Sequence, residues 1–86
     1  MLKQSNPTDI GKRILHAASY QFGLVIKLAL FAIEEALYFA DTTLEERHFA
    51  VAFKNWKGCA EAFNPFLVND FLQIDTQKMF TSEELV

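Results

Sequence analysis

The side chains that carry chemistry are few in this 86-residue chain, and they are widely separated. The two histidines, His16 and His48, have no partner at the spacing of a zinc site, and the single Cys59 cannot supply one. A cysteine nucleophile needs a histidine beside it, whereas a lone cysteine after a helix-stopping glycine is more often a packing residue. We therefore expect no metal site and no catalytic cysteine.

Paired carboxylates do not predict an acid–base site either. Glu34 and Glu35 are adjacent, and adjacent side chains on a helix point about 100° apart, so the two cannot share a proton. Glu45 and Glu46 fit the start of a helix, where Thr43 and Glu46 have the spacing of a capping box. With no glycine-rich phosphate loop, nucleophile elbow or Walker A sequence, the chain alone is predicted to be no enzyme and to hold no cofactor.

Length and composition predict one small domain with surplus apolar surface. A domain of 86 residues has a small core, yet 51% of the residues are hydrophobic and nine are Phe. Part of that apolar surface is therefore expected to meet a partner or another domain. One cysteine and no segment resembling a signal peptide favour a reducing, cytoplasmic setting.

Hydrophobic spacing predicts an all-α fold, a small bundle of three helices in residues 7–58, or of four if a short helical turn forms near 66–72. The first helix is expected from Pro7 to about Tyr20, with Gly23 in a left-handed turn after it. The second, 24–40, is apolar around nearly its whole circumference, which is typical of a buried central helix. It is too short, and with three charges too polar, for a membrane span, so no membrane partner is expected. The third begins at the capping box and ends at Gly58.

The residues that follow the third helix are predicted to form an apolar strap, 59–75, over the helical core. Pro65 forbids a continuous helix. Candidate interaction residues here are Phe63, Asn64, Pro65, Phe66 and Leu67. The Asn-Pro-Phe sequence also resembles the peptides that EH domains bind, although its apolar flanks favour burial. Residues 76–86 are expected to be a flexible tail of the single domain 1–86.

Two stretches together resemble a known kind of domain. "QFGLVIKLALFAIEEAL" followed by "TTLEERHFAVAF" resembles the helical lid of AAA+ ATPases. "TLEERHFAVAF", Gly58-Cys59, Asn-Pro-Phe at 64–66, Asp70 and "QID" at 73–75 are similar to the C-terminal region of TniB-like transposition ATPases. The resemblance covers about residues 14–75, and its Gly-Cys and Asn-Pro-Phe parts are its more specific features.

The resemblance implies a non-catalytic C-terminal lid that acts in oligomer assembly. Its partners would be its own ATPase domain, neighbouring protomers, and a transposase or target-selection protein, with DNA bound by the parent assembly. ATP and Mg²⁺ would be ligands of that parent. Lys27 stands at the sensor-two position, where the family has an arginine that reaches the γ-phosphate, and Arg13 or Lys12 is the alternative phosphate-facing cation. The alternative, which a lysine in place of the arginine favours, is that Lys27 is an ordinary lysine extending from an apolar surface.

Two further interpretations remain open from the residues alone. The chain fits a freestanding helical adaptor that binds a partner protein through the strap or a groove. It also fits a DNA-binding module that uses Lys3, Lys12 and Arg13. A net charge of −3 disfavours the DNA-binding interpretation, because DNA is itself an anion.

Overall fold

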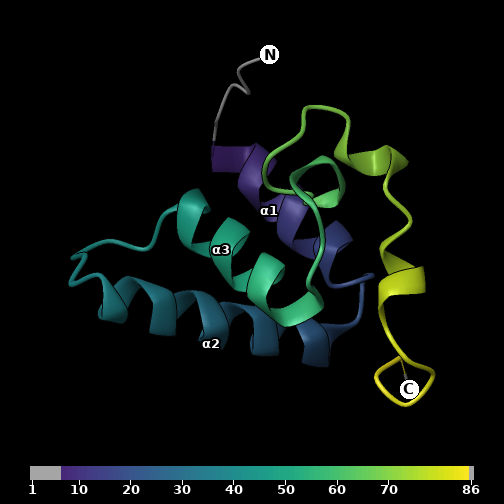
Figure 1. Ribbon diagram of the computed structural model, residues 1–86, viewed down its shortest axis with the longest axis horizontal. Helices are drawn as coiled ribbons and strands as arrows, with labels where there is room; N and C mark the ends of the chain where they lie inside the picture. The colour runs from purple at the N-terminus through teal and green to yellow at the C-terminus, as the bar shows by residue number, and fades with distance from the viewer. Residues whose placement is uncertain (1–6, 86) are drawn as a thin grey trace.

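The computed structural model describes residues 7–85 as an all-α domain (Figure 1). Its helices are α1 (Pro7–Ala17), α2 (Phe22–Tyr38) and α3 (Glu46–Lys57), and the 3-10 turns η1 (Glu61–Phe63), η2 (Phe71–Gln73) and η3 (Thr76–Met79) follow. No strand occurs in this part of the chain. The predicted all-α fold is confirmed, with 3-10 turns in place of a fourth helix.

The core lies where α3 packs on α2, and α1 closes one side of it (Figure 1). Small Ala32 and large Leu28 of α2 face Phe49 and Phe53 of α3, and all four are buried. Phe49 and Phe53, four residues apart on α3, are thus in the core, whereas Trp56, three residues farther on, is half-buried. Helix α2 has one face in this core.

The first turn differs from its prediction. Helix α1 ends at Ala17, and the left-handed residues are Ser19 and Tyr20, with φ of 52° and 59°, while Gly23 lies inside α2. The Tyr20 amide donates to the Leu15 carbonyl at 2.9 Å, which closes the end of the helix without a glycine.

Helix α3 begins later than predicted. Its N-cap is Glu45, not Thr43, and the position three residues on is His48 instead of Glu46. The Glu45 amide donates to His48 Nδ1 at 2.8 Å, so the imidazole does what a glutamate does in an ordinary capping box. At the other end Gly58 has φ 65° and donates to the Lys54 carbonyl, as expected of a glycine stop.

The strap runs back over α1 and α3 (Figure 1). Asn64 makes its turn, since its side-chain amide donates to the Ala50 carbonyl of α3 at 2.8 Å and its Oδ1 accepts from the Phe66 amide at 3.0 Å. This places the Phe66 ring stacked on Phe49, with centroids 5.6 Å apart. Phe71 and Ile74, farther along the strap, are also buried.

Residues 76–85, the segment expected to be a flexible tail, pack against α3 and the strap. Thr76 and Phe80 are buried, and Phe80 lies against Trp56 at 5.2 Å between ring centroids. Lys57 Nζ donates to the Met79 carbonyl at 3.1 Å and to the Glu84 carboxylate at 3.2 Å. Lys57 is at the end of α3, far from Met79 and Glu84 in sequence, so local sequence patterns do not predict these contacts.

Within 7–85, no single helix is both long and apolar enough to cross a membrane. Helices α1 and α2 pass such a test only when joined, and they are bent by 112° relative to each other.

Candidate functional site

Arg13, one of the two candidate nucleotide sensors, is enclosed by protein atoms. Its Nε lies 2.6 Å from Asp9 Oδ2, and its Nη1 donates to the carbonyl oxygens of Pro65, at 2.7 Å, and Val68. The guanidinium also lies over the Phe71 ring, 4.4 Å from its centroid. With only 3% of its surface exposed, Arg13 holds the strap on α1 and has little surface left for a ligand.

Lys27, the other candidate sensor, is exposed on α2. Its ammonium lies 5.7 Å from the centroid of the Trp56 ring, a long cation–π contact with α3. Because the side chain is exposed, its ammonium remains accessible to an anionic group.

The five candidate interaction residues of the strap divide into two groups. Asn64, Pro65 and Phe66 are buried and complete the core. Phe63 and Leu67, which flank them, are 58% and 43% exposed. The Asn-Pro-Phe turn is thus not displayed as a receptor-bound peptide would be, and only its two neighbours present apolar surface.

Among the described residues, a row of exposed large apolar side chains lies on α2, not on the strap. Five side chains on one edge of this helix are exposed by 42–78%, and together we call them the apolar stripe: Phe22, Ile26, Leu30, Ile33 and Leu37. Successive members are three or four residues apart, so all five point within roughly 80° of one another around the helix. The stripe lies away from the face of α2 that is in the core.

A shallow groove separates α2 from α3 beside this stripe. Its volume is about 350 Å³, and its walls are Phe31, Glu34, Glu35, Ala52, Asn55 and Trp56. The two carboxylates and the aromatic pair Phe31 and Trp56, whose centroids are 5.4 Å apart, make its character acidic and aromatic.

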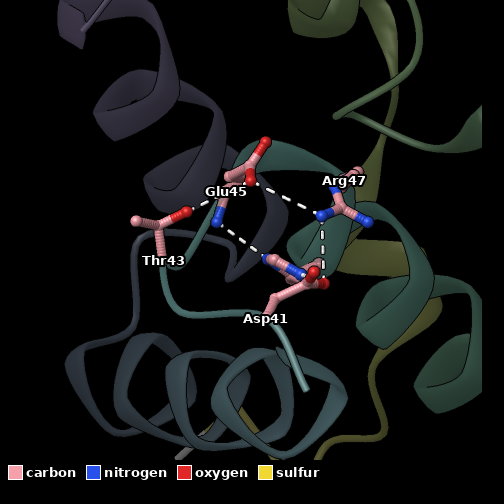
Figure 2. Close-up of polar contacts among 5 residues, drawn as sticks. Asp41, Thr43, Glu45 and Arg47 are labelled. Carbon is pink, nitrogen blue, oxygen red and sulfur yellow. Dashed lines mark hydrogen bonds and ion pairs between the residues drawn. The ribbon is translucent and has the colours of Figure 1, made fainter. Parts of the chain in front are cut away.

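A polar cluster joins the loop after α2 to the start of α3 (Figure 2). Arg47 Nη2 lies 3.0 Å from Asp41 Oδ2 and 3.5 Å from Glu45 Oε2, and Thr43 Oγ1 donates to Glu45 at 3.1 Å. A hydrogen bond from His48, followed by one from Arg47, lowers the pKa of Asp41. Hydrogen bonds from Arg47 and then Thr43 lower the pKa of Glu45.

The His48–Asp41 pair in this cluster has the residue types of a catalytic dyad, but neither ring nitrogen of His48 is available to a substrate. Nε2 lies 2.7 Å from Asp41 Oδ2, while Nδ1 accepts from the Glu45 amide. Both ring nitrogens are engaged and the residue is 2% exposed. A histidine base needs one nitrogen directed at a nucleophile or substrate, so His48 here caps α3.

The remaining reactive groups are also held by local contacts. His16 Nε2 lies 2.6 Å from the Ile74 carbonyl and its Nδ1 3.0 Å from the Tyr20 hydroxyl. Burial raises the pKa of the Cys59 thiol, which disfavours the reactive thiolate. Among residues 7–85, no group of three or more His, Cys, Asp or Glu side chains is placed to hold a metal ion.

The cations considered for DNA binding do not form a described cluster. Lys12 is exposed and Arg13 is buried, while Lys3 lies outside the described residues. Only one of the three is therefore available on the described surface.

The apolar stripe is not among the features expected from the sequence, although a signal for it is present. Helix α2 is expected to be a buried central helix, but Leu37 and Tyr38 are 72% and 81% exposed. Helices α3 and α1 cover only one side of α2. The signal was the spacing of four, three and four residues from Ile26 to Leu37, which marks a second apolar seam on the same helix.

A scan against models of protein families and searches of curated proteins and of solved structures found no match to this chain.

Proposed function

We propose that this chain is a protein-interaction domain without catalytic activity of its own, and that the apolar stripe of α2 is its binding surface. The observation that carries the proposal is the exposure of five large apolar side chains in one row, headed by Phe22 at 78% and Leu37 at 72%. Contiguous apolar surface of this kind on a small domain marks a place where another protein binds.

The two faces of α2 differ in what they contact. Leu24, Leu28, Ala32 and Ala36 are buried against the rest of the domain. A helix at the surface of an isolated domain normally needs only this one apolar face. The second face costs solubility and contributes nothing to the core, so we assign it to contact with another protein.

A cross-linking experiment tests this assignment. A photoreactive benzoylphenylalanine at Leu30, in the middle of the stripe, is expected to form a covalent protein adduct on illumination in cells. The same group at Leu72, which is 62% exposed on η2, is the matched control and is expected to form none. Absence of any protein adduct at Leu30 would contradict the proposed function.

The lid of a TniB-like AAA+ ATPase is the second candidate, and the exposure of Lys27 supports it. In that case the stripe packs on the ATPase domain of the same polypeptide or of a neighbouring protomer, and the parent binds ATP and Mg²⁺, DNA, and a transposase or target selector. Arg13 is left out of this proposal because it is occupied by Asp9 and the strap.

The lid proposal is tested on the gene and on the parent protein. Walker A and B sequences encoded in frame upstream of Met1 are expected, and Lys27→Ala in that parent should weaken ATP binding or turnover while Lys12→Ala does not. A reading frame that starts at Met1 with no such region would exclude it.

A further inference from the structure

We propose that the partner on the apolar stripe is a second copy of this chain, with the two α2 helices antiparallel about a two-fold axis near Leu30. This inference rests on the proposed function, since it takes the stripe as the binding surface and names its occupant. It is carried by three features of α2: the spacing of the stripe, the charges along its edge, and its area.

The spacing of the stripe matches a helix–helix seam. Ile26, Leu30, Ile33 and Leu37 are separated by four, three and four residues, the alternation that keeps apolar side chains facing a partner helix along its length. The residues are 46%, 55%, 42% and 72% exposed. In the antiparallel arrangement Leu30 lies on the axis, and Ile26 packs against the partner subunit's Ile33.

The charges along α2 fit an antiparallel second copy. Lys27 and Glu34 are seven residues apart and both are exposed, so they lie on the same edge of the stripe, one toward each end. When two such helices pair antiparallel, like edges meet. Lys27 then lies opposite the partner subunit's Glu34, and the two-fold symmetry repeats this ion pair.

A parallel pair would lose this complementarity. In a parallel pair, the edge of the stripe that carries Lys27 and Glu34 meets the second edge of the partner helix. That second edge holds Ala29 and Ala36. Lys27 and Glu34 would have no charged residue opposite them. The position of the two charges therefore distinguishes one orientation from the other.

The area of the stripe is sufficient for a small specific interface. Five side chains of this size and exposure present on the order of 500 Å² per copy. Two copies therefore bury on the order of 1,000 Å², which is at the lower end of specific interfaces and above most crystal contacts. We expect a reversible dimer with a Kd on the order of micromolar. A two-fold pair also covers both stripes and leaves no open end for further growth.

Sedimentation equilibrium of the 86-residue chain over about 1 to 500 µM measures the association directly. A monomer–dimer equilibrium is expected for the unmodified chain. Leu30→Glu should give a monomer with an unchanged far-UV circular dichroism spectrum, because Leu30 is 55% exposed and outside the core. Leu72→Glu, on the strap, is the matched control and should still dimerise.

Charge reversal tests the predicted ion pairs. Lys27→Glu places like charges opposite each other twice and should raise the Kd about tenfold at low salt. The double variant Lys27→Glu with Glu34→Lys restores opposite charges and should return the Kd to within about twofold of the original. Equal weakening by the single and the double variant would contradict the proposed alignment.

Cysteine cross-linking tests the orientation. With Cys59→Ser as background, Leu30→Cys should form a disulfide-linked dimer by itself under mild oxidation. Ile26→Cys and Ile33→Cys should each link poorly alone, since like residues are about 10 Å apart along the antiparallel pair. A mixture of the two variants should link efficiently. Efficient linking of Ile26→Cys to itself would instead show a parallel pair and overturn the proposal.

The outcomes separate this inference from the proposed function. A chain that stays monomeric at the highest concentration overturns the dimer, whatever else the stripe contacts. If benzoylphenylalanine at Leu30 then captures a different protein, the proposed interaction function stands with another occupant. A monomer that co-sediments with phosphatidylcholine–phosphatidylserine vesicles through the stripe would also overturn the dimer.

Discussion

Arg13 Nη1 donates to the carbonyl oxygen of Pro65 at 2.7 Å, across 52 positions of sequence. The same guanidinium is paired with Asp9 on its own helix. An arginine with several fixed donors suits this position, since it satisfies buried carbonyl groups on the strap while its charge is neutralised on α1. The contact joins the first helix to the segment that completes the core.

Replacing Arg13 should therefore destabilise the whole domain. Arg13→Ala leaves the Asp9 carboxylate and the Pro65 carbonyl without this partner, and the expected loss is about 3 to 5 kcal/mol of unfolding free energy. That is a large part of the stability of a domain of this size. Urea denaturation followed by circular dichroism measures it.

Lys12→Ala is the matched control, because Lys12 is the exposed neighbouring cation, and it should change stability by less than about 0.5 kcal/mol. Equal effects of the two substitutions would show that Arg13 does not hold the strap.

The strap itself should respond unequally to truncation of its phenylalanines. Phe66 is 1% exposed and stacks on Phe49, so Phe66→Ala should cost about 3 to 5 kcal/mol through lost contacts and the cavity left behind. Phe63, two positions before the proline, is 58% exposed, so Phe63→Ala should cost less than about 1 kcal/mol. Thermal unfolding of both variants gives the comparison, and a reversed order would contradict the observed direction of the strap.

The polar cluster of Figure 2 should make stability depend on pH through Asp41. Hydrogen bonds from His48 and then Arg47 lower the pKa of this carboxyl below its ordinary 3.8. Because the folded pKa of Asp41 is below its unfolded value, the ionised carboxylate stabilises the fold fully at pH values above the unfolded pKa. This stabilisation is lost as the pH falls through the folded pKa. Asp41→Asn should lower the free energy of unfolding at neutral pH. It should also make that free energy fall less steeply as the pH is lowered into the acid range.

Urea midpoints measured from neutral to acid pH test this expectation. Asp75→Asn is the control, because Asp75 is 56% exposed and its ion pair with Lys78 spans 3.8 Å. It should leave the shape of the curve unchanged. An Asp41→Asn profile parallel to that of the unmodified chain would exclude Asp41 as the group responsible.

The turn after α2 should be improved by a glycine. Ala40 has φ 57°, a left-handed conformation in which the β-carbon is crowded, and it lies between the last turn of α2 and the Asp41 amide that donates to the Ala36 carbonyl at 2.9 Å. Ala40→Gly should stabilise the domain by about 0.5 to 1 kcal/mol. Ala60→Gly, at φ −71°, should not stabilise it, because there glycine only adds conformational freedom to the unfolded chain. An equal gain in stability at both positions would contradict the role of the left-handed conformation at Ala40.

Much of the secondary structure follows from local sequence. Apolar residues three and four positions apart predict the helices because a helix repeats every 3.6 residues. Gly58 ends α3 because few other residues adopt its conformation readily. Pro65 breaks the following segment because its ring excludes a helical hydrogen bond. These effects act within a few residues, so they can be read without knowing the fold.

Tertiary structure decided which side of each apolar segment is covered. The sequence shows α2 as apolar on nearly all sides, but only packing against α3 leaves Leu28 buried and Leu30 exposed. In the same way, the Asn64 bonds turn Phe66 inward and leave Phe63 outside. Burial of Arg13 depends on carbonyl groups more than fifty residues away. Periodicity describes one helix at a time, whereas burial depends on which neighbours share the limited area of a small core.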